Sequence, residues 1–224
     1  MAYLSAEEHK LVSDAVGEAE ATTSGEIVTV LADRSDGYSD VIHVYCAAIA
    51  FTMMSLFAAF PAPFLNFWDW IIGGWGQSWS RGELASMTIV LGLLAYVAGL
   101  LIFMWEPLKF ALLPGPVKSA RVHAQAIKHF KVGAEGRTTG HTSVLIYLSM
   151  REHRAEIVAD ESIASKVSAD VWGVAMVDML GEIKRGRVAE GMACGVRDVG
   201  IVLAEHFPRG EDDENELPDR LIEV

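Results

Sequence analysis

The chain has few cysteines, no excess of basic residues and almost no charge in one long segment. Only two of its 224 residues are cysteine, which excludes a small secreted fold held together by disulfides. The formal net charge is -12, which argues against a nucleic-acid-binding protein, because such proteins carry basic patches. Hydrophobic residues make up 51% of the chain, too many for a disordered protein.

Charge is missing above all from residues 41–105, whose charged residues are Asp69, Arg81 and Glu83. Two uncharged apolar runs lie in this segment, at residues 42–60 and 84–105. A helix needs about 20 apolar residues to cross the hydrocarbon core of a bilayer, and each run is long enough. We therefore predict that residues 41–105 form a two-helix transmembrane hairpin and that the protein is integral to a membrane.

The segment between the two spans is rich in tryptophan, with Trp68, Trp70, Trp75 and Trp79. Tryptophan favours the membrane–water interface, where its apolar ring and its polar N–H are both satisfied. Glycines at residues 73–76 argue against one rigid helix. We therefore predict that residues 61–83 form an interfacial hairpin loop; a cofactor or quinone pocket is the alternative.

Basic residues follow the second span. Residues 106–137 contain six cationic and two acidic residues, which by the positive-inside rule places both termini on the cytoplasmic side of a bacterial inner membrane. A helix predicted over 117–131 carries Lys118, Arg121 and Lys128 on one face. That pattern is typical of a helix that contacts anionic headgroups; an ordinary solvated face is the alternative.

The remaining sequence predicts one α/β domain split by the hairpin into residues 1–40 and 106–210. Ser5 and Glu8 form a capping box that begins a helix over 5–22. Apolar, β-branched runs predict strands at 26–32, 142–149 and 154–160, and the last two form a hairpin. Helices are predicted at 161–184 and 186–206. Residues 211–224 form an acidic tail of a composition typical of disorder.

The motifs that mark common catalytic sites are absent: the chain has no P-loop, nucleophile elbow, HExxH or CxxC pattern. Candidate chemistry is acidic instead. Asp33 follows the first strand, Asp160 and Glu161 follow the third, and Asp170 lies on the next helix. Ligands favour the carboxyl ends of strands, and converging carboxylates suit Ca²⁺ or Mg²⁺. Solvated turn and helix-cap carboxylates are the alternative.

Several of these segments resemble the TPM domain family, which is named after a thylakoid acid phosphatase, a photosystem II repair protein and a nematode receptor modulator. The residues concerned are Leu-Ser-Ala-Glu-Glu at 4–8, Thr-Ser-Gly-Glu-Ile-Val at 23–28 and Arg-Gly-Arg at 185–187. The resemblance implies a three-layer α/β/α sandwich with a small mixed sheet, tethered to a membrane. It also suggests a role in maintaining or modulating membrane complexes. Phosphatase activity and divalent-metal binding are attributed to some members of the family.

Together these features favour a membrane-anchored domain that serves as a noncatalytic accessory, assembly or maintenance factor of a membrane protein complex. No resident cofactor is expected under this hypothesis. A divalent-metal-dependent phosphatase is the alternative, with Asp33, Asp160, Glu161 and Asp170 as its metal ligands. A lipid-surface sensor acting through the basic helix is a second alternative.

Overall fold

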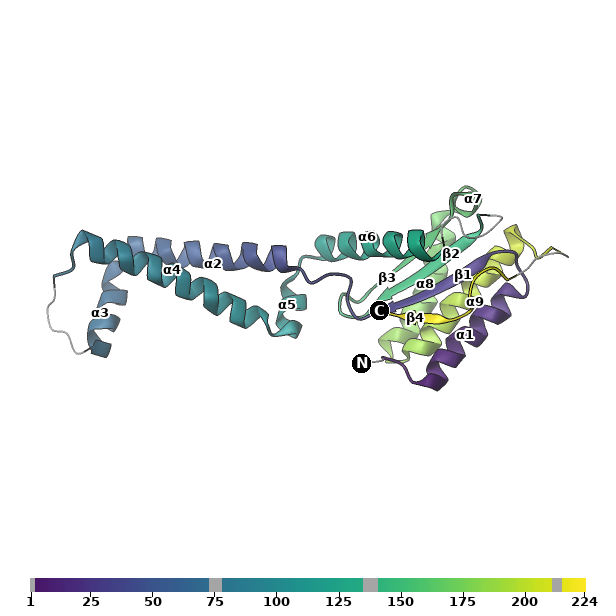
Figure 1. Ribbon diagram of the computed structural model, residues 1–224, viewed down its shortest axis with the longest axis horizontal. Coiled ribbons are helices and arrows are strands. Elements are labelled where there is room, and N and C mark those ends of the chain that lie inside the picture. The colour runs from purple at the N-terminus through teal and green to yellow at the C-terminus, as the bar shows by residue number, and fades with distance from the viewer. Residues whose placement is uncertain (1–2, 73–77, 135–140, 211–214) are drawn as a thin grey trace. The chain divides into compact units, whose positions relative to one another are not determined.

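The computed structural model describes residues 3–72, 78–134, 141–210 and 215–224. The chain divides into two compact units. One combines Met1–Asp36 with Pro114–Val224, and we call it the α/β domain. The other is Gly37–Leu113, which we call the helical unit (Figure 1). The helical unit is thus inserted into the sequence of the α/β domain.

A four-stranded sheet forms the middle of the α/β domain, in the order β3-β2-β1-β4. Its strands are β1 (Glu26–Ala32), β2 (Ser143–Ser149), β3 (Arg154–Ala159) and β4 (Leu221–Glu223). β1 is parallel to β2 and β4, whereas β3 is antiparallel to β2. Every residue of β1 and β2 is buried, as expected of central strands that are covered on both faces.

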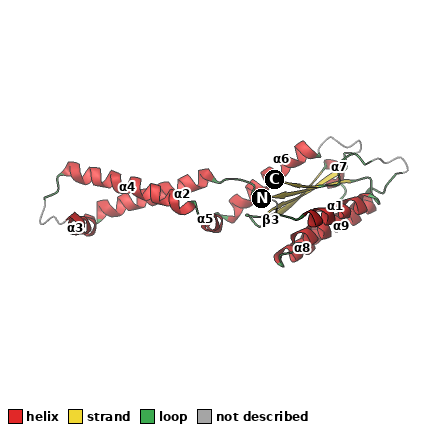
Figure 2. Cartoon of the chain, turned by 60° about the horizontal axis from the view of Figure 1, so that its bottom comes forward, coloured by secondary structure: helices red, strands yellow, loops and turns green. Residues whose placement is uncertain are grey.

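Helices cover both faces of this sheet. One face packs against α1 (Ala6–Glu20) and α9 (Val188–His206), with α8 (Ala169–Lys184) beside α9, and the other face packs against α6 (Gly115–Gly133). Figure 2 shows α6 on the opposite side of the strands from α1, α8 and α9. The short α7 (Glu161–Ala164) follows β3. The predicted three-layer α/β/α sandwich with a small mixed sheet is confirmed.

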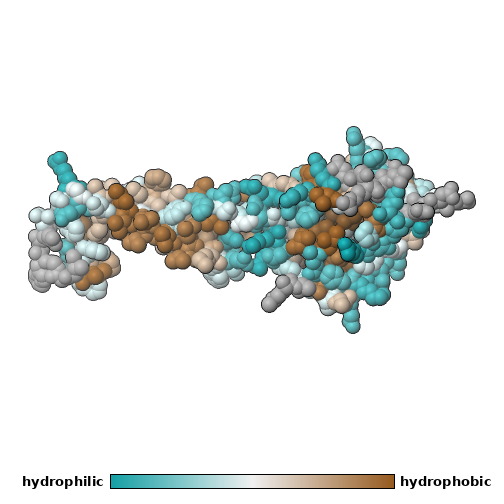
Figure 3. Space-filling model, in the orientation of Figure 1, coloured by the Kyte–Doolittle hydropathy of each residue, from teal (hydrophilic) through white to brown (hydrophobic). Residues whose placement is uncertain are grey.

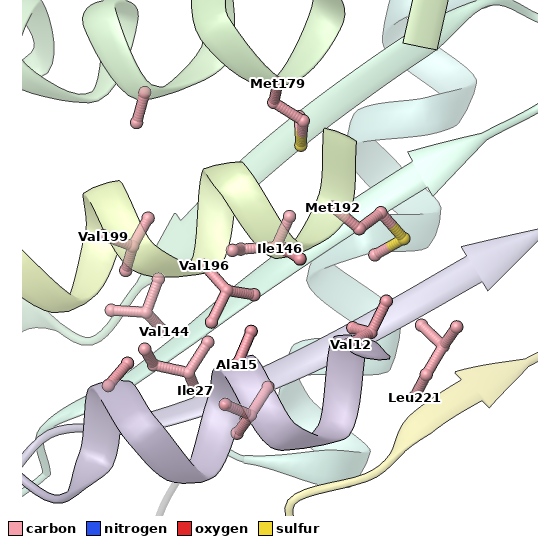
Figure 4. Close-up of a cluster of buried hydrophobic side chains, with 14 of the residues drawn as sticks. Val12, Ala15, Ile27, Val144, Ile146, Met179, Met192, Val196, Val199 and Leu221 are labelled. Carbon is pink, nitrogen blue, oxygen red and sulfur yellow. The ribbon is translucent and has the colours of Figure 1, made fainter. Parts of the chain in front are cut away.

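Two apolar clusters hold the layers together. The larger cluster lies between the sheet and helices α1, α8 and α9, and Figure 4 shows Val12 of α1, Ile27 of β1 and Val196 of α9 among its side chains. The smaller cluster joins Phe130 of α6 to Tyr147 of β2 on the other face. Burying each such side chain stabilises the fold by about 1.5–3 kcal/mol.

The helical unit contains α2 (Ser39–Ala59), α3 (Pro61–Ile72), α4 (Arg81–Phe103) and α5 (Glu106–Leu112). α2 and α4 are long and apolar enough to cross a membrane, and only 17% of the most apolar window of each is buried. Their exposed surface is predominantly apolar (Figure 3). Such exposure would be unfavourable in water but matches hydrocarbon. The two helices pack side by side, with Gly99 of α4 against Cys46 of α2.

Residues 61–72 form a helix, although the sequence analysis predicted a loop there. The glycines behind that prediction come after the end of α3, and Pro61 is tolerated at the first position of a helix because its missing N–H would have no partner there. Figure 1 shows α3 running across the direction of α2. Trp75 and the rest of residues 73–77 lie outside the described residues.

The predicted acidic tail also contains regular structure. Leu221, Ile222 and Glu223 form β4 along the free edge of β1, and Leu221 is buried in the larger cluster. A three-residue strand has too few positions to show an apolar period, and it exists because the edge of β1 offers unpaired backbone groups. The prediction of a disordered tail is therefore wrong for these three residues.

Gly200 on α9 allows α1 to approach closely. A Cβ added there would lie 2.6 Å from the Cβ of Ala19, a distance that only a shift of backbone could relieve. We expect Gly200→Ala to lower the free energy of unfolding by about 1–3 kcal/mol through overpacking. Chemical denaturation followed by circular dichroism measures this change.

The matched control is Gly173→Ala on α8, where an added Cβ would meet no atom of the described residues within 4 Å. Alanine has a higher helix propensity than glycine by about 1 kcal/mol. We therefore expect this control to keep or raise stability. Equal effects of the two substitutions would contradict close packing at Gly200.

Candidate functional site

A hollow of about 620 Å³ opens at one end of the sheet. It lies where β3 ends beside the beginning of β2, because the two strands are antiparallel. Its described lining consists of Phe130, His141, Ala159, Asp160, Glu161, Ser162 and Ser165. The hollow therefore combines one apolar wall with carboxylate, imidazole and hydroxyl groups.

Asp160 is fixed in this hollow by the backbone of β2. Its Oδ2 accepts a hydrogen bond from the Ser143 N–H at 2.9 Å, and its own N–H donates to the Ser143 carbonyl at 3.0 Å. His141 has a left-handed φ of 50°, and its carbonyl accepts a hydrogen bond from the Ser162 hydroxyl. The side chain of Asp160 thus has one oxygen committed to the fold.

Asp33 lies at the opposite end of the sheet. It follows Ala32, which pairs with Ser149 at the end of β2, whereas Asp160 lies beside Ser143 at the start of that strand. Six strand residues separate the two positions, or about 20 Å at 3.3 Å per residue. The Asp33 carboxylate accepts a hydrogen bond from the Tyr3 hydroxyl and pairs with Arg151 at 3.0 Å. The Tyr3 hydroxyl and then Arg151 lower the pKa of Asp33.

The four carboxylates predicted as metal ligands therefore do not share one point. Asp160 and Glu161 line the hollow, but Asp33 is at the other end of the sheet, and Asp170 is exposed in the first turn of α8. The strands that precede Asp33 and Asp160 run in opposite directions, and so their carboxyl ends face opposite ways. Within the described ranges, no group of three or more His, Cys, Asp or Glu side chains could hold a metal ion.

Two of the predicted membrane-surface tryptophans project from α3: Trp68 is 41% exposed and Trp70 is 78% exposed. Trp79, which precedes α4, is half-buried. These positions suit an interfacial role, because both side chains keep exposed ring surface.

The predicted basic face on α6 is partly neutralised. Arg121 pairs with Asp36 at 3.2 Å, Lys128 is exposed and Lys118 is half-buried. The inner face of the helix, with Val122 and Phe130, packs on the sheet. The basic face of α6 therefore keeps exposed cationic side chains, but the pairing of Arg121 with Asp36 makes it less positive than the sequence of the helix alone indicates.

A group of buried carboxylates escaped the sequence analysis. Glu26 of β1 accepts hydrogen bonds from the N–H groups of Glu216 and Leu217, so it fastens the C-terminal segment to the sheet. Glu20 is only 8% exposed and accepts from the Ile27 N–H at 2.7 Å. Burial, with smaller contributions from the carboxylates of Glu26 and Asp219, raises the pKa of Glu20 to about 9. The feature of the sequence that could have revealed this group is Glu26, a glutamate at the start of an otherwise largely apolar strand.

Comparisons with known proteins support the fold. No family model matches the chain, and no curated protein matches it. The chain is similar to the NMR structure of BA42 protein from the psychrophilic bacterium Bizionia argentinensis, with 20% sequence identity and a TM-score of 0.57. The match covers 100% of this chain and 97% of that one. This likeness concerns the fold alone, and it is consistent with the α/β/α sandwich that the TPM resemblance implies.

Replacement of Glu20 tests the buried carboxylates. Because the pKa of Glu20 is raised in the folded state, the folded chain binds an extra proton between about pH 4.5 and pH 9. The free energy of unfolding therefore falls as pH rises through this window. We expect Glu20→Gln to remove that fall and to raise stability at pH 8 by roughly 1–3 kcal/mol, measured by denaturation at several pH values.

Glu7→Gln, an exposed change on the same helix, is the control for the loss of one carboxylate. A Glu20→Gln profile that parallels the wild type would contradict the burial of a protonated carboxyl.

Proposed function

We propose that this chain is a membrane-anchored, TPM-like domain that acts as a noncatalytic accessory, assembly or maintenance factor of a membrane protein complex. The observation that carries this proposal is the position of the two apolar helices. They are inserted between β1 and α6, inside the sequence of one domain. An insertion connects the domain to the helical unit at two points of the chain, whereas a terminal tether would connect it at one.

The exposed surface of the two helices supports a membrane location. Large apolar side chains project from both, including Val44 and Phe51 on α2 and Leu93, Leu94 and Leu101 on α4. Between the helices, Gly92 of α4 lies against Met54 and Gly99 lies against Cys46. Small residues at a helix–helix contact allow the close packing that holds helices together in lipid. The outward residues are left for lipid or for the helices of a partner.

Anchoring has a direct consequence for binding. A domain held at the membrane meets other membrane proteins at a much higher effective concentration than a freely diffusing one would. Weak contacts through the α/β domain then suffice for a stable complex. In our proposal the membrane is the bacterial inner membrane, and the basic segment after the second span keeps both termini cytoplasmic.

The hollow at the end of the sheet favours a second candidate, a divalent-metal-dependent phosphatase. Asp160 and Glu161 would supply carboxylates. A Ca²⁺ site takes six to eight oxygen ligands, whereas Mg²⁺ binds through one or two carboxylates with waters and substrate phosphate. The described lining therefore fits Mg²⁺ better than Ca²⁺. The lipid-surface role of α6 has weaker support, because Arg121 pairs with Asp36.

Membrane anchoring and assembly can be tested together on the full chain. We expect the wild type to stay with the membrane after carbonate extraction and to migrate in native gels, after mild detergent, as a species larger than a monomer. Leu93→Arg puts a cation near the centre of α4, where insertion costs about 2.5–3.5 kcal/mol. It should lower the membrane fraction, and Leu93→Ile should not.

Orientation is read from cysteine labelling with an impermeant maleimide. A cysteine at Ser78 should react from outside the cell and one at Ser119 should not. A chain that is always monomeric in detergent and that crosslinks to no membrane protein would overturn the accessory role.

Catalysis is tested with p-nitrophenyl phosphate in the presence of Mg²⁺ or Ca²⁺. We expect the purified full chain to show no turnover above the uncatalysed rate, because one oxygen of Asp160 is committed to the Ser143 N–H and Asp33 lies at the other end of the sheet. Metal-dependent turnover that is lost in Asp160→Asn and kept in Asp33→Asn would establish the second candidate instead.

A further inference from the structure

The segment at residues 215–224, which we call the strap, covers the edge of β1 through a small number of contacts. Its three-residue strand β4 lies beside β1 (Figure 1), and the Val224 N–H donates to the Leu31 carbonyl at 3.0 Å. The strap buries the side chains of Leu217 and Leu221, which are 7% and 5% exposed. Because this apolar contribution is small, a change in a few polar contacts can offset it.

Three carboxylates meet where the strap crosses the end of α1 and the start of β1. Glu26, the first residue of β1, accepts hydrogen bonds from two backbone N–H groups of the strap at 3.1 and 3.2 Å. Asp219 of the strap lies against α1, since a Cβ added at Gly17 would be 3.1 Å from its Oδ2. Glu20, the last residue of α1, is 8% exposed and interacts with the charges of the other two. The strap is therefore docked on a group of like charges.

A proton on Glu20 relieves this repulsion. Its Oε1 accepts from the Ile27 N–H at 2.7 Å, whereas its Oε2 is buried and has no hydrogen-bond partner among the described residues. Burial, and then the carboxylates of Glu26 and Asp219, raise the pKa of Glu20 to about 9. A protonated Oε2 carries no charge and becomes a hydrogen-bond donor beside the acceptor oxygens of Asp219.

The other charged groups near Glu20 leave this balance in place. Arg209, which follows α9, donates from Nη1 to the backbone carbonyl of Glu20 at 3.5 Å, and a bond to the backbone neutralises no carboxylate. Glu216 adds a negative charge on the strap, and burial followed by this charge raises the pKa of Glu26. Arg220 on the strap is exposed, where water and salt screen its charge.

We propose that the strap is a proton-dependent cover of the β1 edge: it stays docked while Glu20 carries a proton and is released as Glu20 loses it. The docked state binds this proton more tightly than the released state, so docking must weaken as pH rises toward the pKa of the docked state. Release leaves the N–H and C=O groups on that edge of β1 unpaired, an arrangement that accepts a strand from another protein. The inference concerns the α/β domain alone and is independent of the proposed function.

Hydrogen–deuterium exchange of the full chain in detergent measures docking. Peptides from residues 215–224 contain the hydrogen-bonded amides of Glu216, Leu217 and Val224, and a peptide from β2 reports unfolding of the whole domain. Protection is the intrinsic exchange rate at each pH divided by the observed rate. We expect protection of the strap to fall by at least about tenfold between pH 6 and pH 8, because linkage allows up to about tenfold per pH unit.

The β2 peptide should stay more strongly protected than the strap at both pH values. Protection of the strap that is the same at pH 6 and pH 8, that is absent at both, or that falls only together with that of β2 would overturn the proposal.

Variants identify the group that loses the proton. Glu20→Gln keeps the oxygen that accepts from Ile27 and cannot ionise, so protection of the strap at pH 8 should rise by at least about tenfold. Glu18→Gln is the matched control, because it removes an exposed carboxylate from the same helix; it should change that protection less than about twofold. Equal effects of the two variants would overturn the role of Glu20. If Glu20→Gln does not fold, Asp219→Asn supplies the test and should make the fall in protection smaller.

His9 is the alternative sensor, because histidine is the usual pH-responsive side chain and His9 pairs with Glu223 of the strap at 2.9 Å. In His9→Gln we expect the fall in protection between pH 6 and pH 8 to persist. A fall that is lost in His9→Gln and kept in Glu20→Gln would overturn the proposal.

Discussion

The pairing of β1 with β2 is the constraint on which the rest of this structure depends. Each residue from Glu26 to Ala32 lies beside one from Ser143 to Ser149, although residues 33–142 separate the strands. The two buried strands stabilise the core by apolar burial, and the entropic cost of closing a long connection rises only with the logarithm of its length. The pairing requires the chain to return to the same domain after the helical unit. If α2 and α4 each cross a membrane, this requirement is met, whereas one or three crossings would leave the two strands on opposite sides.

How well the sequence predicted each element depends on where its stabilising contacts come from. The capping box at Ser5 and the apolar run at residues 26–32 are local signals, and α1 and β1 formed where they indicated. α3 was missed because nearby glycines outweighed an apolar run that packs Phe64 against Phe57. β4 was missed because its pairing depends on the edge of β1, which no residue of the tail reveals.

The acidic residues show the same limit for the candidate site. Their positions after strands were predicted correctly, but a site also needs strand directions. The hairpin that places Val144 opposite Ala159 sends Asp160 away from Asp33. Conversely, Glu20 and Glu26 were not predicted as site residues, because the sequence does not show which carboxylates become buried. Only the folded sheet puts them beside the segment that holds Asp219.

The C-terminal segment closes one edge of the small sheet. An open strand edge invites pairing with other chains. On the β1 side this edge is covered by β4, and Glu223 accepts hydrogen bonds from the Tyr3 and Leu4 N–H groups and pairs with His9 at 2.9 Å. The last strand is thereby fastened to the first helix, and Glu26 fastens the segment before it. With that edge closed, strand addition next to β1 is blocked.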